Sequence, residues 1–230
     1  MSARPLGRRF YARDARQLAP LLLNKVLVRA GPKGERMAAR IVEVEAYAGS
    51  EDAGSHAFRG PTRRNQTMFG PPGHLYVYFT YGMHWCANVV ASTDGVATAV
   101  LLRAAAPTGG LDQMRARRVA AHGDRDLCSG PARLAQAFGL TGDADGTDLV
   151  RGPLRIVDDG TPPPARPGRS TRIGLREGRG DEHPWRWFVP GDPNVSRGAA
   201  RRLDSPAPTR RAATRRPRAT TTRAPHAAGC

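Results

Sequence analysis

The stretch from Ile41 to Asn88 constrains both the fold and the chemistry of this chain. It reads IVEVEAYAGSEDAGSHAFRGPTRRNQTMFGPPGHLYVYFTYGMHWCAN. Runs rich in apolar and aromatic residues flank a long polar segment with Gly and Pro, a pattern typical of strands joined by a loop. Aromatic residues are only 6% of the 230 residues, yet most of them gather here with three of the six histidines. We therefore predict a pocket that stacks a flat ring.

The first strand of this stretch carries two carboxylates. Alternation over residues 38–47 predicts that Ile41, Glu43 and Glu45 share one face, with Tyr47 following them, while the intervening valines and alanine take the other face. A carboxylate beside an aromatic ring near a strand end can act as a general base on water. The alternative is an ordinary solvated strand face, and alternation does not choose between the two carboxylates.

A hairpin is predicted next, with strands over 75–79 and 84–90 joined by a Thr-Tyr-Gly-Met turn. Tyr81 lies at its tip, where an aromatic side chain can act as a wedge in a base stack. The alternative is that Tyr81 folds back against Trp85 or Met83 in a small cluster. The residues alone leave both readings open.

Helical signals complete a mixed α and β body. Asp14 is expected to cap a helix through Leu23, with Pro20 favouring a kink or an early stop. A second helix is predicted over 131–138, with Ser129 as its N-cap. The α/β mixture predicts an α+β domain.

The charge predicts a polyanionic partner. The chain has 36 Lys+Arg against 20 Asp+Glu, a net charge of +16, and only Lys25 and Lys33 are lysines. Arginine binds phosphate bidentately and stacks on bases, so nucleic acid is the expected partner. Residues 199–230 hold eight arginines against Asp204 alone, a charge of +7, which leaves +9 for residues 1–198. This segment has one Leu and no aromatic residue, so we predict one domain over 1–198 and a disordered tail over 199–230.

Several kinds of chemistry lack their sequence signals. Cys86, Cys128 and Cys230 are far apart and no histidine stands at metal-ligand spacing, so we expect no metal. No apolar run reaches the length of a membrane span, and a cytoplasmic protein, associated with the nucleoid if bacterial, is expected. Neither Lys25 nor Lys33 lies in the aromatic region, so a Schiff-base mechanism would need one of them to enter the site.

Taken together, these segments resemble the 3-methyladenine (alkyladenine) DNA glycosylase family. The resemblance covers roughly residues 6 to 197. It rests on EVEAY at 43–47, His56, RRN at 63–65, MFGPPGHLYVYFTYGMHWCAN at 68–88, AVLLRAAAP at 99–107, LCSGPARLAQAFG at 127–139, RIGL at 172–175 and WRWFVPGDPNVS at 185–196.

The resemblance implies a single α+β domain around a curved, mostly antiparallel sheet, with a β-hairpin that enters the DNA minor groove. It implies a monofunctional enzyme of base excision repair that flips out alkylated or deaminated purines and leaves an abasic site. The expected partner is double-stranded DNA containing damaged purines, bound by a monomer without metal or organic cofactor. Two other classes stay open: a non-catalytic minor-groove DNA-binding module and a hydrolase of free nucleosides.

The same resemblance assigns the reacting groups. Glu45 matches the base that activates water, and Arg103 matches an arginine near that water, although a plain salt bridge is the commoner role of a strand-end arginine. Tyr81 matches the hairpin tyrosine that fills the space left by the flipped base. His84 and Thr80 depart from the better-known vertebrate pattern, which bears on substrate preference more than on the reaction.

The remaining assignments concern the base pocket. Tyr47 and Tyr78 match the aromatic residues that stack on the two faces of the flipped purine, and His56 contributes to the same pocket. Asn88 matches the residue that crowds the exocyclic amino group of guanine. Ile173 falls where an apolar residue faces the pocket.

Overall fold

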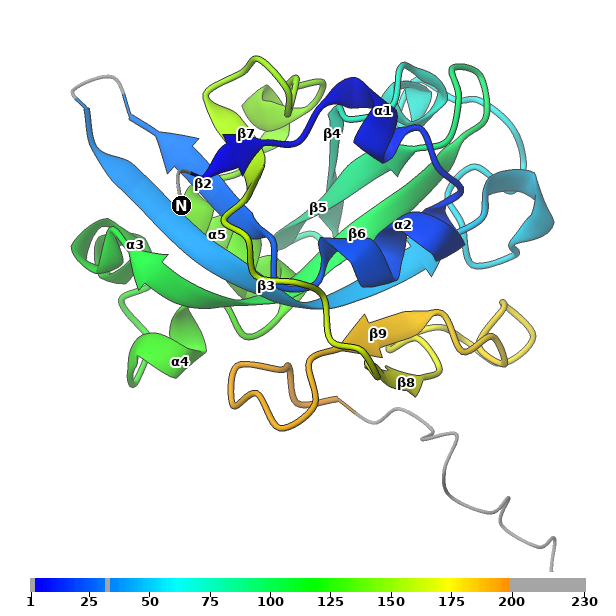
Figure 1. The fold of residues 1–230 in the computed structure, drawn as a ribbon. Coiled ribbons are helices and arrows are strands. Elements are labelled where there is room, and N and C mark those ends of the chain that lie inside the picture. The colour runs from blue at the N-terminus through cyan, green and yellow to red at the C-terminus, as the bar shows by residue number, and fades with distance from the viewer. Residues whose placement is uncertain (1–2, 32–33, 199–230) are drawn as a thin grey trace, which may run out of the picture.

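One antiparallel sheet organises the computed structural model, which describes residues 3–31 and 34–198 (Figure 1). Within those residues the sheet has nine strands, in the order β1-β7-β2-β3-β6-β5-β4, with β9 added to β3 and β8 to β9. The helices and the antiparallel sheet confirm the predicted α+β class. The strands are β1 Arg4–Pro5, β2 Val26–Ala30, β3 Arg36–Tyr47, β4 Leu75–Thr80, β5 His84–Ala91, β6 Thr98–Gly109, β7 Leu154–Asp158, β8 Gly168–Ser170 and β9 Arg186–Phe188.

Short helices cover this sheet and fill its connections. In Figure 1, α1 and α2 lie on one side of the long strands β3 and β6, whereas the β8–β9 pair lies on the other. The helices are α1 Arg8–Tyr11, α2 Ala15–Leu22, α3 Leu111–Arg117, α4 Asp124–Leu127 and α5 Pro131–Phe138, with 3-10 turns η1 Gly49–Glu51, η2 Gln66–Phe69 and η3 Gly142–Ala144.

Two helix-end predictions need correction. Asp14 caps α2 as expected, its carboxylate accepting from the Arg16 backbone N–H at 2.8 Å. Pro20 neither stops the helix early nor marks its end, because α2 continues to Leu22. For α5 the N-cap is Gly130 and not Ser129, whose hydroxyl instead accepts from Arg133 at 3.1 Å.

The strict alternation predicted for β3 is wrong at one point. In the β3–β6 ladder, Ile41 pairs with Ala105 and Glu43 with Ala104, so Val42 has no counterpart on β6. This β-bulge moves Ile41 to the apolar core, away from the face that carries Glu43 and the following odd-numbered residues. A bulge inserts one residue into a period-2 pattern and so exchanges the two faces.

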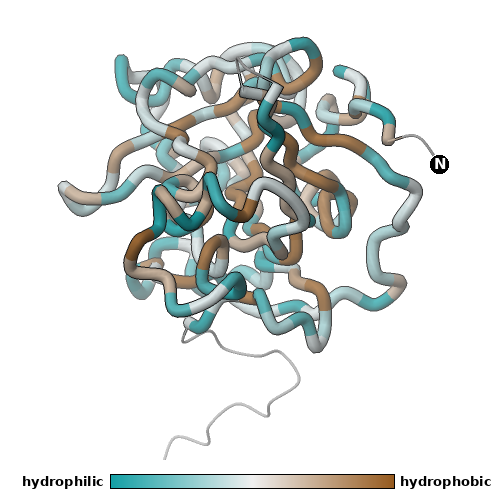
Figure 2. Tube along the Cα trace, turned by 90° about the vertical axis from the view of Figure 1, so that its left-hand side faces the viewer, coloured by the Kyte–Doolittle hydropathy of each residue, from teal (hydrophilic) through white to brown (hydrophobic). Residues whose placement is uncertain are grey.

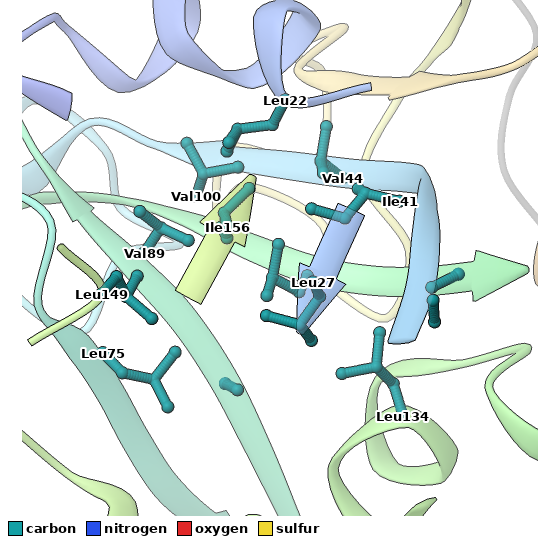
Figure 3. Close-up of a cluster of buried hydrophobic side chains, with 14 of the residues drawn as sticks. Leu22, Leu27, Ile41, Val44, Leu75, Val89, Val100, Leu134, Leu149 and Ile156 are labelled. Atoms are coloured by element: carbon teal, nitrogen blue, oxygen red, sulfur yellow. The ribbon is translucent and has the colours of Figure 1, made fainter. Parts of the chain in front are cut away.

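The main core fills the side of the sheet that faces α2 and α5. Buried side chains from α2, α5 and six strands converge there, as Figure 3 shows for Leu22, Leu27, Ile41, Val44, Leu75, Val89, Val100, Leu134, Leu149 and Ile156. Figure 2 shows the hydrophobic segments running through the middle of the molecule, with hydrophilic segments on the outer loops. Burial of this apolar surface is the dominant favourable term in folding.

The predicted hairpin is formed by β4 and β5, in register from Leu75 opposite Val89 to Thr80 opposite His84. Tyr81 at the turn has φ +52°, which is unusual for a residue with a side chain. Its side chain is 78% exposed, which does not fit the alternative of packing back into a satellite cluster.

Other predictions concern absences or the tail. In the described part of the chain, no helix is long and apolar enough to cross a membrane, and no three His, Cys, Asp or Glu side chains are grouped as metal ligands. Cys86 and Cys128 are free and buried. The tail over 199–230 lies outside the described residues, as does Lys33.

Candidate active site

A cavity of about 320 Å³ opens beside the β4–β5 hairpin. This volume is within the range of small-molecule sites, roughly 300–1,000 Å³. Its walls come from β3, the following loop, β4, β5, β6, the start of α5 and the loop after β8. The lining residues include Tyr47, His56, Tyr76, Tyr78, Tyr81, Cys86, Asn88, Arg103, Pro131, Ile173 and Leu175. Every residue expected at the site lines this cavity except Glu45.

Glu45 lies directly behind the cavity wall and is fully buried. Three lining residues hold its carboxylate. The Tyr47 hydroxyl donates to Oε2 at 2.9 Å. The Ile173 backbone N–H and Arg103 Nη1 contact Oε1 at 2.7 and 3.1 Å. An ionised carboxylate offers about four acceptor positions, so these contacts leave one position of Glu45 for a further donor such as water.

Glu43 is also fully buried but is held differently. Its Oε1 accepts from Arg103 Nε and Arg186 Nε, both at 2.7 Å, and from the Ser196 hydroxyl at 2.9 Å. Its Oε2 accepts from the Ser196 backbone N–H at 2.6 Å. Four donors fill the roughly four acceptor positions of a carboxylate. The contact sets therefore distinguish the two carboxylates that alternation left equivalent.

Arg103 joins the two carboxylates. The register of β3 against β6 passes from Ala104 to Leu102, so Arg103 is the extra residue of a second bulge. Burial lowers the pKa of Arg103, but the charges of Glu45 and Glu43 outweigh it and raise that pKa above its usual value. Burial likewise raises the pKa of Glu43, yet Arg103 and Arg186 hold it below its ordinary value. All three groups are therefore charged near neutral pH.

Aromatic rings form one side of the cavity. The Tyr76 and Tyr78 rings stack at 5.5 Å between centroids, and the His56 ring meets Tyr78 edge-on at 4.4 Å. His56 Nδ1 lies 3.0 Å from the Tyr76 hydroxyl. Burial, aided by the positive charge of Arg64, lowers the pKa of His56, while burial raises the pKa of Tyr76 to about 12. Both side chains are therefore neutral near pH 7.

Tyr47 is backed by a buried arginine that the sequence reasoning did not single out. The Arg172 guanidinium lies 4.6 Å from the Tyr47 ring centroid and 5.1 Å from the Trp185 ring. Its Nη1 and Nη2 bind Asp52 at 2.5 and 2.7 Å, and it also donates to the backbone carbonyl of Ala46 at 3.0 Å. This bidentate pair fixes the guanidinium, which in turn supports the Tyr47 ring.

The other expected residues complete the cavity. Asn88 is buried, and its amide donates to the backbone carbonyl of Tyr76 at 3.2 Å. Ile173 lines the wall through its side chain and binds Glu45 through its backbone N–H. Tyr81 is at once a lining residue and an exposed hairpin tip.

The sequence reasoning missed the residues that hold the site from behind. Arg172, Arg186 and Ser196 belong to segments that resemble the glycosylase family, but nothing local marks their roles. Arg172 and its partner Asp52 are 120 residues apart, and Ser196 is 153 residues from Glu43. Only the fold brings these pairs together.

Comparisons with known proteins find relatives over most of the chain. A family model described as methylpurine-DNA glycosylase matches residues 9–193. A Burkholderia cenocepacia protein named "Putative 3-methyladenine DNA glycosylase" is 56% identical over 198 residues, which cover 85% of this chain and 92% of the relative. Proteins of the same name from Streptomyces avermitilis and Chlorobium luteolum are 50% and 41% identical, covering 84% of this chain and 91% and 97% of their own lengths.

Proposed function

This chain belongs to the methylpurine-DNA glycosylase family, and we propose that it flips alkylated or deaminated purines out of double-stranded DNA and hydrolyses their N-glycosidic bonds. The family makes it a hydrolase of the DNA-3-methyladenine glycosylase type. One observation carries the proposed mechanism. Glu45 keeps an acceptor position behind the wall of an aromatic cavity, while its neighbour Glu43 has none left among the described residues.

The proposed reaction uses Glu45 as the general base. A water molecule bound at its remaining acceptor position gives a proton to the carboxylate as the water oxygen bonds to C1′ of the deoxyribose. The bond from C1′ to the purine breaks, and its electron pair leaves with the base. A cationic alkylated purine thereby leaves as a neutral molecule. The negative charge of Glu45 also stabilises the positive charge that develops on the sugar.

Stacking in the cavity offsets the cost of flipping. Unstacking a base costs a few kcal/mol, and each base–aromatic stack returns about 1–3 kcal/mol. Tyr47 and Tyr78 take the two faces of the purine, with His56 and Ile173 at its edges. Asn88, which is held by the Tyr76 carbonyl, crowds the amino group that distinguishes guanine.

Tyr81 is the proposed wedge. It is exposed at the hairpin tip and also lines the mouth of the cavity. A ring in this position can fill the stack while the flipped base enters the adjacent cavity. The positive charge of the chain supplies the attraction to phosphates.

The product is an abasic site in an uncut strand. Strand cleavage by a glycosylase would use an amine as nucleophile. Lys25 is buried and pairs with Asp158 at 2.9 Å, so its amine is engaged on β7. This supports a monofunctional enzyme.

The test is release of free base from a hypoxanthine-containing duplex, compared with hypoxanthine nucleoside. We expect release from the duplex and an intact strand until the abasic site is cleaved by alkali. Glu45→Gln should abolish release but keep duplex binding, whereas Glu51→Gln, a matched change of an exposed carboxylate, should change neither. Binding without release would identify a DNA-binding module, and release from nucleoside alone would identify a nucleoside hydrolase.

A further inference from the structure

The proposed mechanism gives no role to Glu43, although it is the most heavily engaged carboxylate at the site. It is fully buried and accepts four hydrogen bonds from three residues. Burying a charge is costly unless it is paired and hydrogen-bonded. The position of these contacts, on the arginine that also binds Glu45, indicates what the buried charge does.

Arg103 divides its donors between the two carboxylates. Its Nε lies 2.7 Å from Glu43 Oε1, and its Nη1 lies 3.1 Å from Glu45 Oε1. From this geometry we propose that Glu43 is a positioning residue, which holds Arg103 and shares its charge so that Glu45 remains basic enough to take a proton from water. This inference rests on the proposed role of Glu45.

The alternative geometry explains why a second carboxylate is needed. A guanidinium has five N–H donors in a planar fork and binds one carboxylate bidentately when nothing else competes. A bidentate pair with Glu45 would fill the acceptor position proposed for water. The Glu43–Nε hydrogen bond keeps Arg103 turned so that one Nη contacts Glu45.

The charge balance supports the same role. Glu43, Glu45, Arg103 and Arg186 form a buried cluster of two negative and two positive charges. Removing the charge of Glu43 leaves one excess positive charge beside Glu45, and a nearby positive charge weakens a carboxylate as a base. The other titratable groups that influence or face Glu45 are Tyr47 on β3, Tyr78 on β4 and Cys86 on β5.

Glu43 also ties the end of the described chain to the site. It pairs with Arg186 of β9 and accepts both the hydroxyl and the backbone N–H of Ser196. Arg186 in turn donates to the Ser170 hydroxyl at 2.9 Å. The loop after β8, which supplies the Ile173 N–H to Glu45, is therefore braced by the same cluster.

The test compares Glu43→Gln with Glu43→Asp in the full chain. The probes are a hypoxanthine duplex for single-turnover excision and a duplex with a tetrahydrofuran abasic analogue for binding. Glu43→Gln should slow excision on the order of ten- to a hundredfold, the range expected for losing a charged hydrogen bond, with analogue binding within about twofold. The acid limb of rate against pH should move to lower pH. Glu43→Asp keeps the charge and should recover most of the rate and the wild-type pH profile.

Asp159→Asn is the matched control, because Asp159 pairs with Arg40 at 2.6 Å and neither residue lines the cavity. Its excision rate should equal that of the wild type. If Glu43→Gln does not fold, Glu43→Gln/Arg186→Gln removes one charge of each sign and must still slow excision while binding persists. Wild-type excision in either folded variant, or equal losses of rate and binding with an unmoved pH profile, overturns the inference. Failure of the wild-type protein to release base would instead overturn the proposed function.

Discussion

Tyr81 gives the sharpest separation between a packed residue and a wedge. The prediction is that Tyr81→Ala leaves the free energy of unfolding within about 1 kcal/mol of the wild type. The side chain is 78% exposed, so only about a fifth of its surface is removed from water. A fully buried aromatic residue covers about 150–250 Å². A fifth of that area, at about 25 cal/mol per Å², corresponds to roughly 1 kcal/mol.

Tyr11 provides the matched control for stability. It is fully buried in the main core and outside the cavity, so the identical change to alanine should cost about 3–5 kcal/mol. Thermal or denaturant unfolding of the two variants should therefore differ by several kcal/mol. Equal losses would show that the hairpin tip is packed in solution.

The functional half of this prediction concerns capture of the flipped base. Loss of one stacking partner worth about 1–3 kcal/mol should weaken capture of the flipped base roughly five- to 150-fold. A fluorescent base next to the lesion would report flipping, and single-turnover excision would report the chemistry. A Tyr81→Ala protein that flips and excises like the wild type would refute the wedge.

Three further predictions follow from buried and terminal charges. Because the folded pKa of Glu43 is depressed, its stabilisation is present above the unfolded value of about 4.3 and is lost as pH falls; unfolding free energy in Glu43→Gln should therefore fall less steeply below that pH. Arg172→Gln leaves Asp52 buried and unpaired and should cost about 3–5 kcal/mol, whereas Arg115→Gln on an exposed pair should cost less than about 1 kcal/mol in the same unfolding assay. We propose that the catalytic domain ends at residue 198, so truncation after Gly198 should keep excision on saturating DNA, while the slope of log affinity against log salt becomes shallower by about 0.9 per lost phosphate contact; loss of excision would move the domain boundary.

The parts of the fold that the sequence predicted are those set by local signals. The β4–β5 hairpin and α5 have apolar runs bounded by turn or cap residues, and both elements form at the expected positions. The end of α2 was wrong because Pro20 was weighed without the packing of Leu18 and Leu22 in the core. Tertiary packing commonly overrides a local breaker in a short helix.

The candidate site divides in the same way. A resemblance over many short motifs named the cavity residues, and seven of the eight line one cavity. It did not distinguish how Glu43 and Glu45 are held, because both lie on one strand face and the difference is in their donors. Those donors come from β6, β9 and the segment near Ser196, and a period-2 pattern contains no information about such distant partners.

The bulges explain why the polar cluster can exist within this sheet. Before Val42, the odd-numbered residues of β3, such as Ile41, face the apolar core; after it, Val44 and Ala46 do. Uninterrupted alternation would put Glu43 and Glu45 on the same face as Ile41, inside the core, where unpaired carboxylates would be very costly. The extra residue turns both carboxylates to the opposite face. The second bulge, at Arg103 on β6, places their shared partner on that face too. Bulges often lie beside active sites because they re-aim side chains, and here the irregular register brings the proposed base and its partner arginine together.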